Sequence, residues 1–243
     1  MTDINSASRT PTVVLVHGAF ADASGWAGVI ERLMAANVPV RAIVNPLRGV
    51  NADAAYAASV FRQIPGPVLA VGHSYGGAVI TNAGSMAENV VGLVYIAAFA
   101  PDEGETLQDI ESGSQDSVLP SALRQTDYPV DSGVLGELSI DVDMFHEAFA
   151  ADLPEAQTAV MARSQRPVSV AAFGEKTVSP AWKKLPSWAV VATQDKAAGS
   201  DVVLSMARRA AAEITEVDAS HVPMMSQPGV VTEVILKAAA TVG

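Results

Sequence analysis

The ten residues from Val68 to Gly77 constrain the fold of this chain more than any other stretch. They read Val-Leu-Ala-Val-Gly-His-Ser-Tyr-Gly-Gly, so a short apolar run enters a G-x-S-x-G pattern, and a helix-like sequence follows from Ala78. This order predicts a strand, a sharp strained turn and a helix, with small residues where strand and helix nearly touch. Ser74 is therefore the predicted nucleophile. The free N–H groups at the start of the helix, including that of Tyr75, would face negative charge that develops beside it.

Composition narrows the class of protein. With 243 residues, of which 49% are hydrophobic, the chain is long enough for one substantial core domain with an insertion. A formal net charge of -11 offers no basic field for nucleic acid, so we expect no such partner. There is no cysteine, which excludes disulfides and thiolate metal sites. The histidines, at 17, 73, 146 and 221, lack ligand spacing, so we expect no metal.

The sequence indicates neither a secretory signal nor a membrane-spanning segment. Met1 to Thr10 is polar and lacks the basic start and apolar stretch of a secretory signal, which predicts a cytoplasmic protein. The longest apolar run, Val90 to Ala100, is far shorter than the roughly 20 residues of a membrane helix and is better interpreted as a buried strand. We expect no membrane partner, and the sequence leaves the oligomeric state open.

Strand-like and helix-like segments alternate along most of the chain. Predicted strands cover Thr12–Val16, Val38–Val44, the run from Val68, Val90–Ala97, Trp188–Ala192 and Ile214–Val217, and predicted helices cover Ser24–Ala36, Asp53–Ile64, Ala78–Ala87, Ser200–Ala212 and Pro228–Ala240. This alternation predicts an α/β fold with a doubly wound, mostly parallel sheet of about six strands. Ligands of such sheets bind beyond the carboxyl ends of the strands, so a crevice is expected between the loop at His17 and Ser74 if the first and third strands are neighbours.

The regular pattern stops between residues 101 and 186. This stretch is polar and rich in Pro, Ser and Gly, with short helical pieces only near 144–150 and 154–163. We expect residues 1–100 and 187–243 to form the core and residues 101–186 to form a cap inserted at the edge that carries Ser74.

Two late loops supply partners for the serine. Asp195 and His221 each follow a predicted strand, so both should emerge at the same edge as Ser74. Asp102, after the strand Val90–Ala97, is the competing acid, and Asp218 stands so close to His221 in sequence that we expect it only to shape the turn. A serine activated by a histidine, which a carboxylate orients, is a nucleophile for acyl transfer.

These residues give the chain a family resemblance along nearly its whole length. With His17-Gly18 near the start, the elbow at Gly72 to Gly77 and the order Ser, Asp, His, it resembles α/β-hydrolases, and within them bacterial esterases related to plant methyl esterases and hydroxynitrile lyases. The resemblance implies an α/β-hydrolase fold and an oxyanion hole made by the backbone N–H groups of Tyr75 and of Ala19 or Phe20. It also implies that His17 and His73 are structural, while His146 is expected to be a solvated cap residue.

The predicted activity is hydrolysis of small, largely apolar esters through an acyl-enzyme on Ser74, without cofactor or metal. Candidate pocket residues, in addition to Phe20 and Tyr75, are Phe99, Leu123, Met144, Phe145, Phe149, Val222 and Met224. The alternatives on the same scaffold are a hydroxynitrile lyase, a cofactor-free oxygenase or perhydrolase, and a slow-turnover ligand-binding receptor. The related lyases carry a lysine where this chain has Val222 and a threonine where it has Gly18, so both positions favour an esterase.

Overall fold

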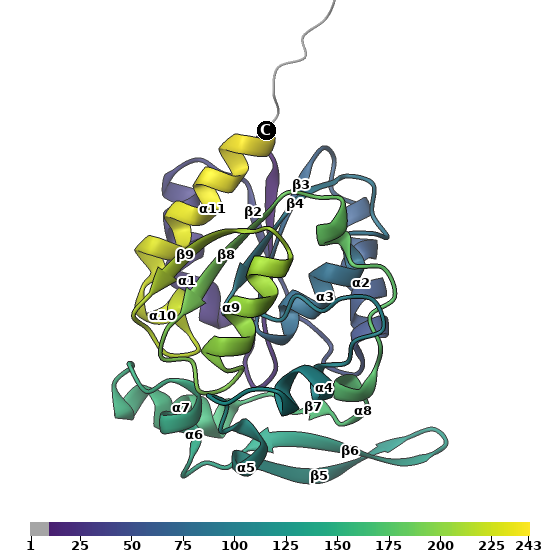
Figure 1. Cartoon of the computed structure of the whole chain (residues 1–243), viewed down its shortest axis with the longest axis vertical. Coiled ribbons are helices and arrows are strands. Elements are labelled where there is room, and N and C mark those ends of the chain that lie inside the picture. The colour runs from purple at the N-terminus through teal and green to yellow at the C-terminus, as the bar shows by residue number, and fades with distance from the viewer. Residues whose placement is uncertain (1–9) are drawn as a thin grey trace, which may run out of the picture.

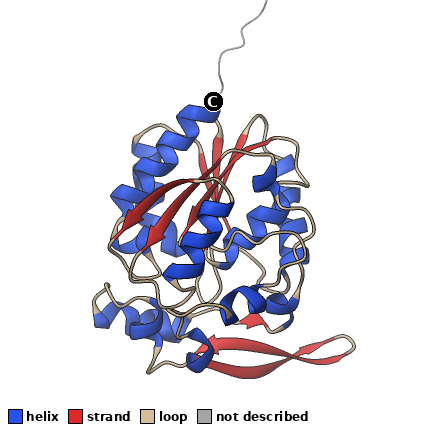
Figure 2. Ribbon diagram, in the orientation of Figure 1, coloured by secondary structure: helices blue, strands red, loops and turns tan. Residues whose placement is uncertain are grey.

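The computed structural model of the chain describes residues 10–243. Its centre is a six-stranded parallel sheet, shown in Figures 1 and 2. The strands are β1 (Thr12–Val16), β2 (Val40–Ile43), β3 (Val68–His73), β4 (Val90–Ile96), β8 (Ser187–Ala192) and β9 (Glu213–Val217), in the spatial order β2-β1-β3-β4-β8-β9. The predicted doubly wound sheet is confirmed, and so is the neighbourhood of the first and third strands. The polar stretch from Met1, apart from Thr10, lies outside the described residues.

Helices cover both faces of this sheet. They are α1 (Ala27–Ala35), preceded by the short helix η1 (Ala23–Trp26), α2 (Val50–Arg62), α3 (Tyr75–Ala83), α9 (Ser200–Arg209), α10 (Pro223–Ser226) and α11 (Pro228–Val242). Helix α1 packs against α11 and α2 packs against α3, and in Figure 1 these two pairs flank the sheet on opposite sides. In the part of the chain that the structure describes, no helix is both long and apolar enough to cross a bilayer.

The central strands are mostly apolar because both of their faces are covered. Every residue of β3 is buried, and β1 is buried from Val13 to Val16. The register brings Val16 opposite Gly72, so the loop after β1 and the turn after β3 leave the sheet side by side. This adjacency places the His17-Gly18 loop next to Ser74.

Most of the segment between β4 and β8 lies beyond the carboxyl ends of the strands, at the lower end of the molecule in Figure 1, and we call this part the cap. On its return to β8 the segment passes through η2 (Ala181–Lys183), which packs against α3 instead. The cap contains α4 (Leu107–Ser112), α5 (Leu119–Ala122), α6 (Phe145–Phe149), α7 (Glu155–Ser164) and α8 (Ala171–Gly174). It also contains an antiparallel sheet of β5 (Leu123–Val130), β6 (Gly133–Ile140) and β7 (Val168–Ser169).

The sequence analysis placed helices in this stretch only near 144–150 and 154–163, so it missed α4, α5, α8 and η2 as well as the β5–β6 hairpin. Most of β5 is exposed on both faces, so its sequence lacks the alternation of apolar and polar residues that identifies a half-buried strand. The hairpin is held by backbone pairing from Leu123 with Ile140 to Val130 with Gly133. Exposed hairpins of this kind leave little trace in the hydrophobic pattern.

Candidate active site

The turn between β3 and α3 holds Ser74 in a strained backbone conformation, with φ 52° and ψ -123°. Glycines make the turn possible because a Cβ on Gly72 would lie 2.5 Å from the carbonyl oxygen of Gly76, and one on Gly76 would lie 2.4 Å from that of Val16. Ser74 is 7% exposed, while the rest of the turn is more deeply buried. The strained turn thus presents one hydroxyl from an otherwise closed backbone.

Asp195 and His221 meet at the same edge of the sheet. Asp195 follows β8 and His221 follows β9, and Nδ1 of the histidine lies 2.8 Å from Oδ2 of the aspartate. The other carboxylate oxygen, Oδ1, accepts hydrogen bonds from the N–H groups of Ala197 (2.9 Å) and Ala198 (3.0 Å). Both side chains are buried, so the pair is shielded from solvent.

Ser74 and His221 line one cavity. Its walls are formed by Ala19, Phe20, Tyr75, Phe99, Ala197 and Ala198 from the core, and by Leu107, Leu119, Phe149 and Phe173 from the cap. Within residues 10–243 no hydrogen bond joins Ser74 Oγ to the imidazole, as is common in triads without substrate. The arrangement brings the Ser74 hydroxyl, the His221 imidazole and an apolar wall together.

The backbone N–H groups near Ser74 differ in availability. The N–H of Phe20 donates to the carbonyl of Arg166 in the cap, at 3.1 Å. The N–H of Ala19 has no acceptor among the described residues, and that of Tyr75 belongs to the first turn of α3, where helical N–H groups are free. Of the two candidates in the first loop, Ala19 therefore remains available to an oxyanion and Phe20 does not.

His17 holds the loop that carries Ala19. Its Nδ1 bonds to the carbonyl of Gly18 at 2.8 Å, and its Nε2 accepts the N–H of Asn45 at 2.9 Å. Burial lowers the pKa of His17 to about 4, so the ring is neutral at physiological pH. These bonds fit the structural role expected for this residue.

Two residues that the sequence analysis did not single out as partners hold the loop of His221. The Nε2 of His73 donates to the main-chain carbonyl of His221 at 2.8 Å, and the two rings lie 4.8 Å apart. Asp152 from the cap accepts the N–H of Ser220 at 3.0 Å and also its hydroxyl. His73 was expected to be structural, and its fully buried ring beside that of His221 fits this role. Asp152 carried no sequence signal, because its partner lies 68 positions away.

Tyr75, which directly follows Ser74, is held in the core by a hydrogen bond of its side chain. The hydroxyl of Tyr75 donates to Oδ2 of Asp53 at 2.8 Å, and both residues are almost fully buried. Burial raises the pKa of Asp53 against the opposing effect of this hydrogen bond. The contact fixes the start of α3, whose first N–H group faces Ser74.

Among the described residues, the remaining candidates make no hydrogen bond or ion pair with the His221 imidazole. Asp102 pairs with Lys183 of η2 at 2.5 Å, and this partner lowers the pKa of the carboxyl group. Asp218 is exposed in the turn before His221. His146 is half-buried, with Nδ1 3.0 Å from Oγ1 of Thr158.

The residues predicted to line the pocket are divided by the structure. Phe99 and Phe149 line the cavity at Ser74, whereas Val222 and Met224 line a second cavity that also touches Phe149. Leu123, Met144 and Phe145 line neither of these two cavities and pack into the hydrophobic core instead. Phe145 packs directly against the ring of Phe149, with centroids 5.0 Å apart.

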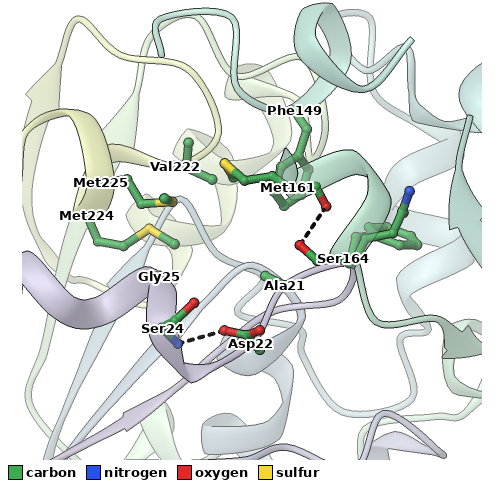
Figure 3. A pocket seen from close by; sticks show the side chains of 12 residues that line it. Ala21, Asp22, Ser24, Gly25, Phe149, Met161, Ser164, Val222, Met224 and Met225 are labelled. Atoms are coloured by element: carbon green, nitrogen blue, oxygen red, sulfur yellow. Dashed lines mark hydrogen bonds between the residues drawn. The ribbon is translucent and has the colours of Figure 1, made fainter. Parts of the chain in front are cut away.

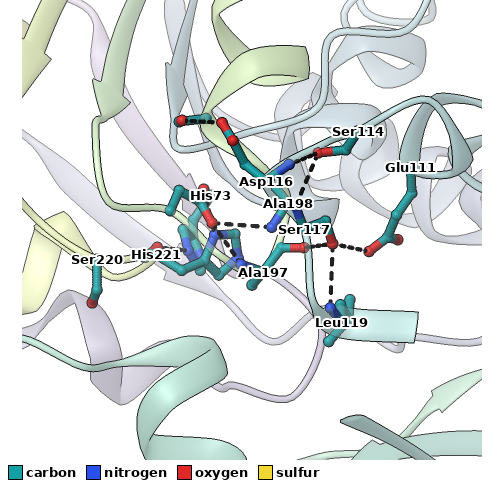
Figure 4. A network of polar contacts seen from close by, with 12 residues as sticks. His73, Glu111, Ser114, Asp116, Ser117, Leu119, Ala197, Ala198, Ser220 and His221 are labelled. Atoms are coloured by element: carbon teal, nitrogen blue, oxygen red, sulfur yellow. Dashed lines mark hydrogen bonds and ion pairs between the residues drawn. The ribbon is translucent and has the colours of Figure 1, made fainter. Parts of the chain in front are cut away.

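A cap carboxylate lies close to Asp195. Glu111 of α4 accepts a hydrogen bond from the Ser117 hydroxyl at 2.9 Å, and the same hydroxyl lies 2.7 Å from the carbonyl of Ala197 (Figure 4). Burial raises the pKa of Glu111 to about 7. Among residues 10–243, no group of three or more His, Asp or Glu side chains is arranged to hold a metal ion.

Solved structures resemble this fold closely. Polyneuridine aldehyde esterase is 19% identical, with a TM-score of 0.80 over 95% of this chain and 100% of that chain. A pyrethroid hydrolase, PytH, is 22% identical, with a TM-score of 0.79 over 96% and 98% of the two chains. The methylesterase MES16 from Arabidopsis is 18% identical, with a TM-score of 0.77 over 95% and 99%. At these identities the likeness shows the fold.

A search of curated protein sequences found no significant match. The model of the alpha/beta hydrolase family matches residues 13–234, which include the turn at Ser74 and the loops of Asp195 and His221. Because this match extends over most of the sequence, the chain belongs to the α/β hydrolase family.

Proposed function

We propose that this protein is a serine carboxylic-ester hydrolase that acts on largely apolar esters through Ser74, His221 and Asp195. The observation that carries the proposal is the buried Asp195–His221 pair, whose imidazole lines the same cavity as Ser74 in its strained turn. The esterase and hydrolase names of the structural neighbours agree with this activity. The cytoplasmic location and the absence of a cofactor stay predictions.

Each group has a distinct role in the proposed reaction. Ser74 Oγ attacks the ester carbonyl while Nε2 of His221 accepts its proton, and Asp195 keeps the proton of the imidazole on Nδ1 and stabilises the imidazolium. The N–H groups of Ala19 and Tyr75 bind the oxyanion. His221 then gives its proton to the leaving alkoxide oxygen, and water, activated by the same imidazole, releases the acid from the acyl-enzyme.

The test is hydrolysis of p-nitrophenyl acetate by wild type and by Ser74→Ala. Alanine fits the turn as well as serine does, so the variant should fold and lose on the order of 10⁶-fold in kcat, as in other serine triads. Ser85→Ala, an exposed serine just after α3, is the matched control and should keep full activity. Turnover by Ser74→Ala close to that of wild type would contradict the assignment.

Two observations favour an esterase over a hydroxynitrile lyase. Val222, at the place where the related lyases carry lysine, is fully buried and offers no charge to a departing cyanide. A Cβ on Gly18 would lie 2.7 Å from that of Ser74, so there is no room for the threonine of the lyases. We expect no cyanide release from mandelonitrile above background. Release in proportion to enzyme, abolished by Ser74→Ala, would overturn the proposal.

A further inference from the structure

A second cavity lies behind the aromatic wall of the site, and Figure 3 shows it from close by. Its volume is about 60 Å³. Met161 of α7 lines one side, Met224 and Met225 of α10 line the other, and Val222 also lines the cavity. We call the space defined by Met161, Val222, Met224 and Met225 the methionine groove.

The groove adjoins the cavity at Ser74. Phe20 and Phe149 line both spaces, and their rings stand edge to face with centroids 6.3 Å apart. The ring of Phe149 also lies 5.0 Å from that of His221, and Val222 directly follows His221 in the chain. Two aromatic side chains thus separate the groove from the reacting groups.

The cavity at Ser74 is too small for both arms of an ester. Its volume is about 10 Å³, which corresponds to about one water molecule. A carbonyl attacked by Ser74 carries an acyl arm and an alcohol arm. At least one of them must extend into adjoining space, and the methionine groove supplies such space.

The lining of the groove fits an uncharged apolar group. Unbranched thioether side chains adapt to ligands of different shape. Of the described residues around the groove, Asp22 is the only charged one, and its carboxylate accepts the N–H of Ser24 at 2.7 Å. The described lining contains no Lys, Arg or His side chain that would pair with an anionic substituent.

The position of the groove indicates which arm it holds. In the first half of the reaction His221 gives its proton to the leaving oxygen, so the alcohol lies on the histidine side of the carbonyl. The groove begins at Val222 and Phe149, the two residues that follow or cover this imidazole.

We propose that the methionine groove binds the alcohol arm of the ester, and that Phe20 and Phe149 turn aside to admit it. This inference rests on the proposed esterase function and names its substrate class: esters of short acids with longer apolar alcohols. Phe149 is a specificity-determining residue in this arrangement.

Two ester series test the inference. Methyl, butyl and octyl acetate vary the alcohol, and p-nitrophenyl acetate, butyrate and octanoate vary the acid. For wild type, kcat/KM should rise along the alcohol series by up to about fourfold for each methylene that the groove buries. The acyl series should show no comparable rise. A preference for long acids, or no dependence on alcohol length, would overturn the assignment.

Variants of Met225 separate the groove from the chemistry. Met225 is half-buried, so Met225→Glu should fold, and its carboxylate should lower the octyl-to-methyl ratio of kcat/KM at least tenfold. Met225→Leu keeps an apolar wall and should keep most of the ratio. Met34→Glu adds the same charge at an exposed methionine of α1 and should leave both series unchanged. An unaltered ratio in Met225→Glu would refute the proposal.

Failure of the inference can be told from failure of the proposed function. If wild type hydrolyses no ester of either series, the esterase assignment fails and the inference fails with it. If p-nitrophenyl acetate is hydrolysed and Ser74→Ala abolishes this activity, the chemistry stands, and the alcohol series alone decides the role of the groove. Phe149→Ala should then raise the octyl-to-methyl ratio. Phe149 is buried, so if the Phe149→Ala variant does not fold, the Met225 variants decide the question.

Discussion

Glu111 offers a prediction in which the sign and the size of a stability change both follow from the structure. This cap residue is 7% exposed, and burial raises the pKa of its carboxyl group from 4.5 to about 7. The protonated acid can donate to the Ser117 hydroxyl while that hydroxyl donates to the carbonyl of Ala197. Glu111→Gln supplies a similar donor without a charge and imitates the protonated form.

Between pH 4.5 and about 7, the folded protein keeps a proton on Glu111 that the unfolded chain has lost. The free energy of unfolding of wild type therefore falls as the pH rises through this window, and the full penalty is present above it. A pKa that moves from 4.5 to about 7 on folding corresponds to about 3 kcal/mol. In Glu111→Gln this penalty is absent.

The assay is urea unfolding of wild type and Glu111→Gln at pH 5 and pH 8. The two proteins should have similar stability at pH 5, and the variant should gain roughly 2 to 3 kcal/mol over wild type by pH 8. Because the pKa of His17 is lowered to about 4, this residue decreases the free energy of unfolding as the pH falls, which is the opposite sign to Glu111. His17 is present in both proteins, so its effect cancels in the difference. Glu103→Gln, at an exposed position of the same cap, is the control. A difference between variant and wild type that does not change with pH would refute the reasoning.

Three further predictions concern the chemistry. In Asp195→Asn, the N–H groups of Ala197 and Ala198 should hold the amide oxygen, so that the NH₂ group faces His221 and imposes the wrong tautomer on the imidazole. We expect kcat for ester hydrolysis to fall by about 10⁴ in this variant and to change little in Asp102→Asn. The reverse result would reassign the acid. Gly18→Ala should displace the nucleophile and lower kcat on the order of 10²-fold while a melting curve still shows a folded protein, because its Cβ would lie 2.7 Å from that of Ser74. Treatment with a chelator should leave ester hydrolysis intact, and activity restored only by zinc would contradict this expectation.

The sheet and the turn at Ser74 could be predicted from the sequence because their signals are local. Strands buried on both faces are continuous apolar runs, and the close contact of β3 with α3 demands glycine at 72, where a Cβ would lie 2.5 Å from the carbonyl oxygen of Gly76. The order of strands in a parallel sheet then brings the loops of Asp195 and His221 to one edge. For these features, sequence neighbours and short-range sterics were sufficient.

Only the tertiary structure determined which N–H groups are free, which side chains support the His221 loop and how the space beside Ser74 is divided into two cavities. Whether Phe20 can donate to an oxyanion depends on a carbonyl at Arg166, and the support of the His221 loop depends on Asp152 in the cap. The two cavities on either side of Phe149 likewise arise from a cap helix that packs on the loop after β9. A hydrogen-bond partner or a cavity wall supplied from far along the chain leaves no periodic pattern in either segment. These features appear only once the cap is placed over the strand ends, because packing between distant segments, rather than local backbone preference, determines them.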